Sequence, residues 1–312
     1  MVDRLNKIVE KFVRETGIEN EDSFNFVKNL IDIFERHYNE IYISNYKKKI
    51  SFNKSYKYSY QFLKAINPSY AEYLKKCKKD GTIELLQINK NDELAYCDCV
   101  DGEPKIYLSL SDTLEDSYNL SHELIHATTL GEDTSITRHI FCEAFSYAIE
   151  ELQRDYFEAN TKIKEYAINR ENTLFDIKKI CERLTIEQKL ILKYLENGKI
   201  YINDILDIYN ETKNKRIISN VFEKIIKRDD ISIDIQQRYV IGYIFGCYMV
   251  DRIYQNKNFN EFFTLNENIN NYSEAELIYS LDLSLTDEEN FNLTSESYKK
   301  LEKSYQKRIQ KR

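Results

Sequence analysis

Apolar residues recur every three or four positions through most of the chain, which is the spacing of one face of an α-helix. Near the start of the chain, the residues with this spacing are Leu5, Ile8, Val9, Phe12 and Val13. Gly17 then ends the segment. The same spacing predicts helices over residues 22–38, 60–76 with a break near Pro68, 118–129, 138–159, 161–183, 186–197, 202–213, 216–228 and 236–255, and two more within 273–312.

Residues 81–110 depart from this period. The runs 82–88, 93–100 and 105–110 are rich in strand-forming residues, and turn-forming residues at 89–92 and 101–104 separate them. They predict two hairpin turns and a small three-stranded sheet. The predicted fold class is mainly α with a small β-sheet (α+β). Only 7 glycines and 2 prolines occur, which argues against an all-β sandwich.

Composition narrows the class of protein further. The net charge is −7 with acidic and basic residues interspersed, so no basic stripe indicates a nucleic-acid partner. No apolar run reaches the length of a membrane span, and the charged start, residues 1–15, is unlike a signal peptide. Six cysteines without a paired spacing favour free thiols. We therefore expect a cytoplasmic protein with no membrane partner.

The pattern H-E-x-x-H occupies residues 122–126 in a predicted helix. His122 and His126 are four residues apart, so their imidazoles lie on one helix face and can share one zinc ion. Glu123 lies beside that position and can take a proton from a water molecule that zinc has made acidic. The alternative is a chance pair of solvated or buried histidines. The chain has only 4 histidines, so two of them rarely fall four residues apart by chance.

A catalytic zinc site needs a third protein ligand. Glu143 follows on the next predicted helix, and Glu150 lies on the same face of that helix, seven residues on. Periodicity alone does not separate the two. Either can also be an ordinary solvated helix acid.

The residues around the motif resemble the oligoendopeptidase F branch of the thimet oligopeptidase family, over roughly residues 94–300. The resemblance rests on T-x-x-D-x-x-x-L-x-H-E at 113–123, E-x-x-S at 143–146 and the tyrosine-rich run Y-V-I-G-Y at 239–243. It implies that Glu143 is the third zinc ligand. It also implies a zincin-type pair of active-site helices within a helical thimet oligopeptidase-like catalytic region at 81–312, preceded by a reduced N-terminal helical lobe at 1–80.

The chain also departs from that family. Ile125 stands where the family has glycine, and its side chain can crowd the approach to the metal. The family places a His and a Tyr just before the tyrosine-rich helix, and those places fall on Ile233 and Ile235. A hydroxyl donor for the developing oxyanion is then expected from Tyr239 or Tyr243, four residues apart on one helix face. Core packing is the alternative for both tyrosines.

The resemblance implies a zinc-dependent endopeptidase or oligopeptidase with one zinc ion per chain and a peptide or protein as substrate. Because the chain is about half the usual length of the family, we expect a more open cleft. The alternative is a catalytically weak or silent zinc-containing protein that binds peptides. The sequence leaves the oligomeric state undetermined.

Overall fold

The computed structural model describes residues 1–38, 49–86, 95–129, 136–160, 165–212, 214–256, 258–288 and 292–310, with the side chains at 136–137, 165–171 and 234–235 excepted. Its α-helices are α1 (Val2–Thr16), α2 (Asn25–His37), α3 (Phe52–Ile66), α4 (Pro68–Lys79), α5 (Glu115–Thr129), α6 (Ile136–Asn160), α7 (Glu165–Asn197), α8 (Ile202–Glu211), α9 (Lys215–Arg228), α10 (Ile233–Asn256), α11 (Phe259–Glu267), α12 (Glu274–Ser280) and α13 (Ser295–Gln310). Its strands are β1 (Ile83–Leu86), β2 (Ala95–Val100), β3 (Glu103–Ser109), β4 (Leu285–Asp287) and β5 (Asn292–Leu293). Two short 3-10 helices are η1 (Glu21–Phe24) and η2 (Ile269–Asn271). The predicted fold class, mainly α with a small sheet, is confirmed.

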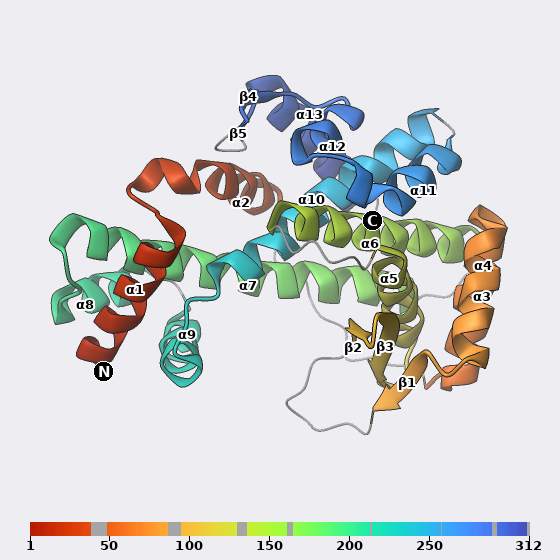
Figure 1. Cartoon of the computed structure of the whole chain (residues 1–312), viewed down its shortest axis with the longest axis horizontal. Coiled ribbons are helices and arrows are strands. Elements are labelled where there is room, and N and C mark those ends of the chain that lie inside the picture. The colour runs from red at the N-terminus through yellow and green to blue at the C-terminus, as the bar shows by residue number, and fades with distance from the viewer. Residues whose placement is uncertain are drawn as a thin grey trace.

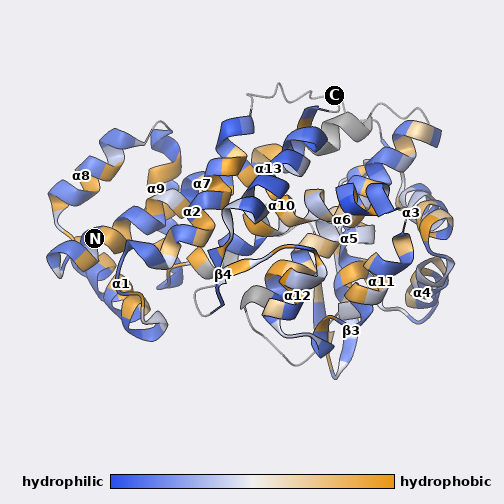
Figure 2. Ribbon diagram, turned by 90° about the horizontal axis from the view of Figure 1, so that it is seen from above, coloured by the Kyte–Doolittle hydropathy of each residue, from blue (hydrophilic) through white to orange (hydrophobic). Residues whose placement is uncertain are grey.

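Three long helices, α6, α7 and α10, run lengthwise through the molecule (Figure 1). The three-stranded sheet, α3 and α4 lie toward one end, and α1, α8 and α9 toward the other. Helix α10 packs along α6 and also contacts α7 and α13. Along many helices, hydrophobic positions alternate with hydrophilic ones in stripes (Figure 2). One buried apolar cluster draws side chains from both sides of residue 80, for example Leu5 and Leu124.

The ends of several helices follow from local chemistry. Gly17 ends α1 with φ 68°, a left-handed conformation that glycine adopts without steric cost. At the start of α4, the Asn67 side chain accepts a hydrogen bond from the Ser69 amide, and Pro68 occupies the first helical position. Ser273 and Glu276 form a capping box at the start of α12. The predicted stop at residue 17 and break at residue 68 are confirmed.

The sheet has the order β1-β3-β2. Strands β2 and β3 are antiparallel, with Tyr96 opposite Tyr107, so the hairpin predicted at 101–104 is confirmed. The first predicted hairpin is wrong, because β1 pairs with β3 in parallel, with Ile83 opposite Ile106. The turn predicted at 89–92 lies outside the described residues. Strand pairing depends on contacts distant in sequence, which the local turn signal could not reveal.

One further prediction needs correction, and one element was not predicted. The helices predicted over 161–183 and 186–197 form one helix, α7, in which the Thr185 hydroxyl donates to the Cys181 carbonyl oxygen and so fits within the helix. The short antiparallel pair β4–β5 was not predicted. Among the described residues, no helix combines the length and apolar character that crossing a bilayer requires. All six cysteines are free thiols.

Candidate active site

The turn from β3 into α5 is held by a small polar cluster. Oδ1 of Asp116 accepts hydrogen bonds of 2.8 Å from both the amide and the hydroxyl of Ser111, and that hydroxyl lies 2.6 Å from Thr113 Oγ1. Asp116 is only 2 % exposed, so these bonds form away from solvent. The T-x-x-D run singled out in the sequence therefore orients the helix that carries the histidines.

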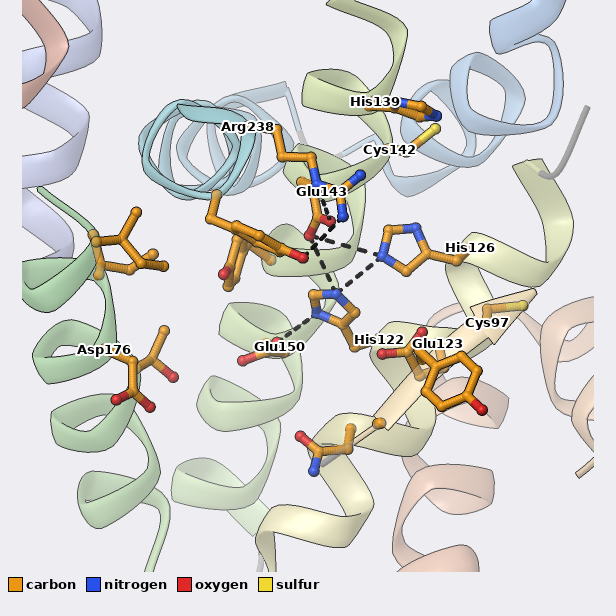
Figure 3. Close-up of a pocket in the computed structure, with 18 of the residues that line it drawn as sticks. Cys97, His122, Glu123, His126, His139, Cys142, Glu143, Glu150, Asp176 and Arg238 are labelled. Atoms are coloured by element: carbon orange, nitrogen blue, oxygen red, sulfur yellow. Dashed lines mark hydrogen bonds and ion pairs between the residues drawn. The ribbon is translucent and has the colours of Figure 1, made fainter. Parts of the chain in front are cut away.

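Helix α5 presents both histidines to one carboxylate on α6, as Figure 3 shows. Nε2 of His122 lies 3.1 Å from Nε2 of His126. Oε2 of Glu143 lies 3.4 Å from the first nitrogen and 3.8 Å from the second. Ligand atoms about 2.0–2.1 Å from one tetrahedral zinc ion lie about 3.3 Å from each other. The three atoms thus have nearly the separations that a single cation requires.

The chemistry of Glu143 also fits a metal ligand. The residue is 5 % exposed, and its Oε2 is a buried oxygen without a hydrogen-bond partner. A buried carboxylate oxygen without a hydrogen-bond partner raises the free energy of the folded state unless a cation lies beside it. Two imidazoles and one carboxylate are a ligand set that zinc commonly takes. Within the described part of the chain, His122, His126 and Glu143 are the group whose ligand atoms, all within 4.8 Å of one another, could hold an ion.

The other nitrogen of His122 has its own partner. Nδ1 lies 2.6 Å from Oε1 of Glu150, two helical turns after Glu143 on α6. Because a carboxylate oxygen accepts, Nδ1 of His122 carries a hydrogen and donates it to Glu150, so Nε2 is the nitrogen left to bind a metal. The Ser146 hydroxyl donates to the His122 carbonyl oxygen at 3.2 Å, which fixes α6 against α5 at this level.

The side chains of the site strongly perturb one another. Burial opposes the charged form of His122, yet Glu143 and Glu150 outweigh it and raise the pKa of His122 well above its ordinary value. Burial lowers the pKa of His126 to about 4, in spite of Glu143. Burial alone would raise the pKa of Glu143, but His126, His122 and Arg238 together lower it. Glu143 is therefore ionised at neutral pH and His126 is neutral, the forms that bind metals, whereas a metal ion would displace a proton from Nε2 of His122.

The predicted general base also lies at this place. Glu123 is 6 % exposed and lines a cavity of about 540 Å³ together with His122, His126 and Glu143. The cavity is walled by β2, α5, α6, α7 and α10. Among the described residues β2 is an edge strand of its sheet, and Tyr96 on it lines the cavity. Its size is within the range of small-molecule and short-peptide sites.

The two candidate tyrosines have different surroundings. Tyr239 lines the cavity, and its hydroxyl oxygen accepts a 2.9 Å hydrogen bond from Arg238. Tyr243 is 1 % exposed, does not line that cavity, and donates to Oε1 of Glu151 at 3.3 Å. The structure brings only Tyr239 to the cluster of His122, Glu123, His126 and Glu143.

Two further residues of the site, Tyr147 and Arg238, were not predicted from the sequence. Tyr147 lines the cavity with its ring edge-on to the His122 imidazole, at 5.3 Å between centroids. Arg238 lies with its Nε 3.7 Å from Oε1 of Glu143. Tyr147 is four residues after Glu143 on α6, and Arg238 directly precedes Tyr239. Their positions next to predicted site residues could therefore have identified both from the sequence.

Two of the departures from the family pattern lie in the apolar core, Ile125 and Ile233, whereas the side chain of Ile235 lies outside the described residues. Ile125 is fully buried among apolar residues and does not line the cavity, so the expected crowding of the metal approach is wrong. Ile233 is 2 % exposed and also belongs to the apolar core.

The fold is shared with solved peptidase structures. The chain is similar to a protein assigned as a peptidase from Chlamydophila abortus, with a TM-score of 0.58 and 16 % identity over 99 % of this chain and 56 % of that one. It is similar to a protein assigned as an oligoendopeptidase F from Bacillus anthracis strain Ames, with a TM-score of 0.57 and 13 % identity over 97 % and 61 %. It is also similar to PZ peptidase A, solved with an inhibitor. The TM-score is 0.54, and the identity is 14 % over 88 % of this chain and 54 % of that one.

At these identities the likeness establishes the fold. The chain spans little more than half the length of each of these proteins. No protein-family model matches the sequence. A search of curated proteins also finds no match.

Proposed function

We propose that this chain is a zinc-dependent peptidase that hydrolyses peptide bonds, in the manner of the oligoendopeptidase F branch that its sequence resembles. The observation that carries the proposal is the convergence of His122 Nε2, His126 Nε2 and Glu143 Oε2 beside Glu123 in one cavity. The shared fold with proteins named as peptidases supports it.

The two histidines and Glu143 would hold zinc, which acidifies a water molecule and polarises a carbonyl group when bound. Glu123 takes the proton from the attacking water and passes it to the leaving amine nitrogen. Tyr239 donates its hydroxyl hydrogen to the carbonyl oxygen as negative charge develops there. The outer edge of β2, which lies beside the cavity, can pair with the main chain of an extended peptide.

The experiment is cleavage of a mixture of internally quenched peptides by purified protein supplied with zinc. We expect cleavage that a chelator abolishes and zinc restores. Glu123→Gln should reduce turnover about 10²–10⁴-fold, since it removes the general base. The same variant should keep its zinc content. Glu158→Gln, at an exposed position of α6, serves as the control and should cleave normally.

A catalytically silent peptide-binding protein is the second candidate. It is favoured by Ile233, which occupies the core where the related family has a polar residue. Bound zinc together with peptides that remain intact would support it, and full activity of Glu123→Gln would contradict the peptidase mechanism.

A further inference from the structure

Helix α10 approaches α6 unusually closely beside the candidate metal ligand. A Cβ atom placed on Gly242 would lie 2.6 Å from Cβ of Glu143 and 3.2 Å from the Ala144 amide nitrogen. One turn on, a Cβ on Gly246 would lie 2.9 Å from both the Ala144 carbonyl oxygen and Cβ of Tyr147. Contacts below about 3 Å are far shorter than packed carbon atoms adopt. Only glycine permits this approach at either position.

The close approach places Arg238 at the Glu143 carboxylate. Arg238, Gly242 and Gly246 are spaced by four residues, so they lie along one face of α10. With the backbone of α10 against Cβ of Glu143, the arginine one turn earlier reaches the end of the same side chain. Its Nε lies 3.7 Å from Oε1, and Figure 3 shows the guanidinium beside that carboxylate.

The two oxygens of Glu143 therefore have separate neighbours. Oε1 faces Arg238, whereas Oε2 faces His122 and His126 at 3.4 and 3.8 Å. A carboxylate held in this way offers a single oxygen to the histidine side. Partners of this kind orient the ligands of metal sites, and their loss typically reduces metal affinity about 10–100-fold.

Arg238 is itself fixed in place. Its Nη2 donates to the Tyr239 hydroxyl at 2.9 Å, and its guanidinium carbon lies 4.9 Å from the centre of the Tyr239 ring. These contacts hold a side chain that remains 27 % exposed on the cavity wall. Because arginine can only donate, the Tyr239 oxygen is the acceptor, and its own hydrogen points elsewhere.

We propose that Arg238 is a positioning residue of this site: by pairing with Oε1 of Glu143 it keeps Oε2 turned toward the two histidines, and zinc affinity depends on that orientation. The proposal rests on the proposed metal site. The arginine charge by itself disfavours a nearby cation, but Glu123, Glu143 and Glu150 already supply three carboxylates around the site. Orientation of the ligand is then the larger contribution of Arg238.

The test compares zinc affinity in the full-length protein, by competition with a chromogenic chelator. Arg238→Met should bind zinc about 10–100-fold more weakly than the native chain. Arg252→Met is the matched control, because Arg252 lies on the same helix, is similarly buried, and bonds the Leu281 carbonyl oxygen far from the cavity. Its zinc affinity should be unchanged.

A second readout separates positioning from general damage to the fold. The visible absorption spectrum of the cobalt-substituted protein reports ligand geometry, and it should change in Arg238→Met and not in Arg252→Met. If Arg238→Met does not fold, Arg238→Lys, which lacks the Nε–H beside Oε1, should shift both readouts in the same direction. Native-like affinity and spectrum in a folded Arg238 variant would overturn the proposal. Failure of the native chain to bind zinc would instead contradict the proposed function.

Discussion

Oε1 of Glu150 lies 2.6 Å from Nδ1 of His122, and this contact determines which imidazole nitrogen faces the rest of the site. Glu150 and Glu143 belong to the same helix, yet they meet opposite sides of one histidine. Helix α6 thus supplies both the candidate ligand and the group that orients its neighbour. The two acids could not be separated by helical periodicity, yet Glu143 is the candidate ligand and Glu150 orients His122.

Replacement of Glu150 by alanine should weaken zinc binding about 10–100-fold, since His122 then loses the acceptor that fixes its tautomer and ring orientation. The measurement is competition for zinc against a chromogenic chelator. Glu158→Ala, an exposed position on the same helix, is the control and should bind as the native chain does. Equal affinity in Glu150→Ala would show that the contact has no part in metal binding.

Replacement of Gly242 by alanine should destabilise the protein by about 1–3 kcal/mol, because the new methyl group overlaps Cβ of Glu143 and forces α10 away from α6. Zinc affinity should fall with it. Gly246→Ala is the matched variant: it also crowds α6, but one turn further from Glu143. Urea unfolding should show a loss for both, and zinc titration a larger loss for Gly242→Ala. The reverse order in zinc affinity would contradict this account of the helix contact.

Glu187 on α7 is expected to make the free energy of unfolding depend on pH. The residue is 2 % exposed, its Oε2 is buried without a hydrogen-bond partner, and burial raises its pKa from 4.5 to about 7. The folded protein therefore holds this proton more tightly than the unfolded chain does. The associated stability is fully present below pH 4.5 and is lost as the pH rises through about 7.

Glu187→Gln should remove that pH dependence while keeping an acceptor for the Ser232 hydroxyl, which lies 3.0 Å from Oε1. The interval from 4.5 to about 7 corresponds to at most about 3 kcal/mol in the free energy of unfolding. The variant should thus be more stable than the native chain at pH 8 and no more stable at pH 4. Urea unfolding at the two pH values measures this. A difference that is the same at both would count against the assignment.

Arg308 on α13 is predicted to be important for stability. It is 2 % exposed and donates to Oε2 of Glu151 at 2.8 Å and to Oδ2 of Asp155 at 2.7 Å. Arg308→Met would leave the buried Glu151 and the partly buried Asp155 with less compensation, at a cost of about 3–5 kcal/mol. Lys303→Met, exposed on the same helix, should change stability by less than about 0.5 kcal/mol. A midpoint of urea unfolding unchanged by Arg308→Met would contradict this.

The local features of the fold could be predicted because they depend on short-range chemistry. Gly17 and Pro68 mark helix boundaries through backbone conformations that few other residues adopt. The spacing of His122 and His126 fixes their common face without reference to the rest of the chain. The parallel pairing of β1 with β3 was missed because it joins strands that are not consecutive.

The remaining site residues depended on how helices cross, which periodicity does not contain. Tyr239 and Tyr243 share a helix face, yet only the first reaches the cavity, while the second meets Glu151 in the core. Glu143 and Glu150 could not be separated by spacing for the same reason. Arg238 was missed because its position at Glu143 follows from the close contact at Gly242, a tertiary feature.

The account depends most on whether His122, His126 and Glu143 hold one metal ion. The direct measurement is the zinc content of the native chain and of Glu143→Ala after equilibration with zinc and removal of the excess. We expect one zinc ion per native chain and little or none in a folded Glu143→Ala protein. A native chain that retains no zinc, or a Glu143→Ala protein that retains as much as the native chain, would contradict the account.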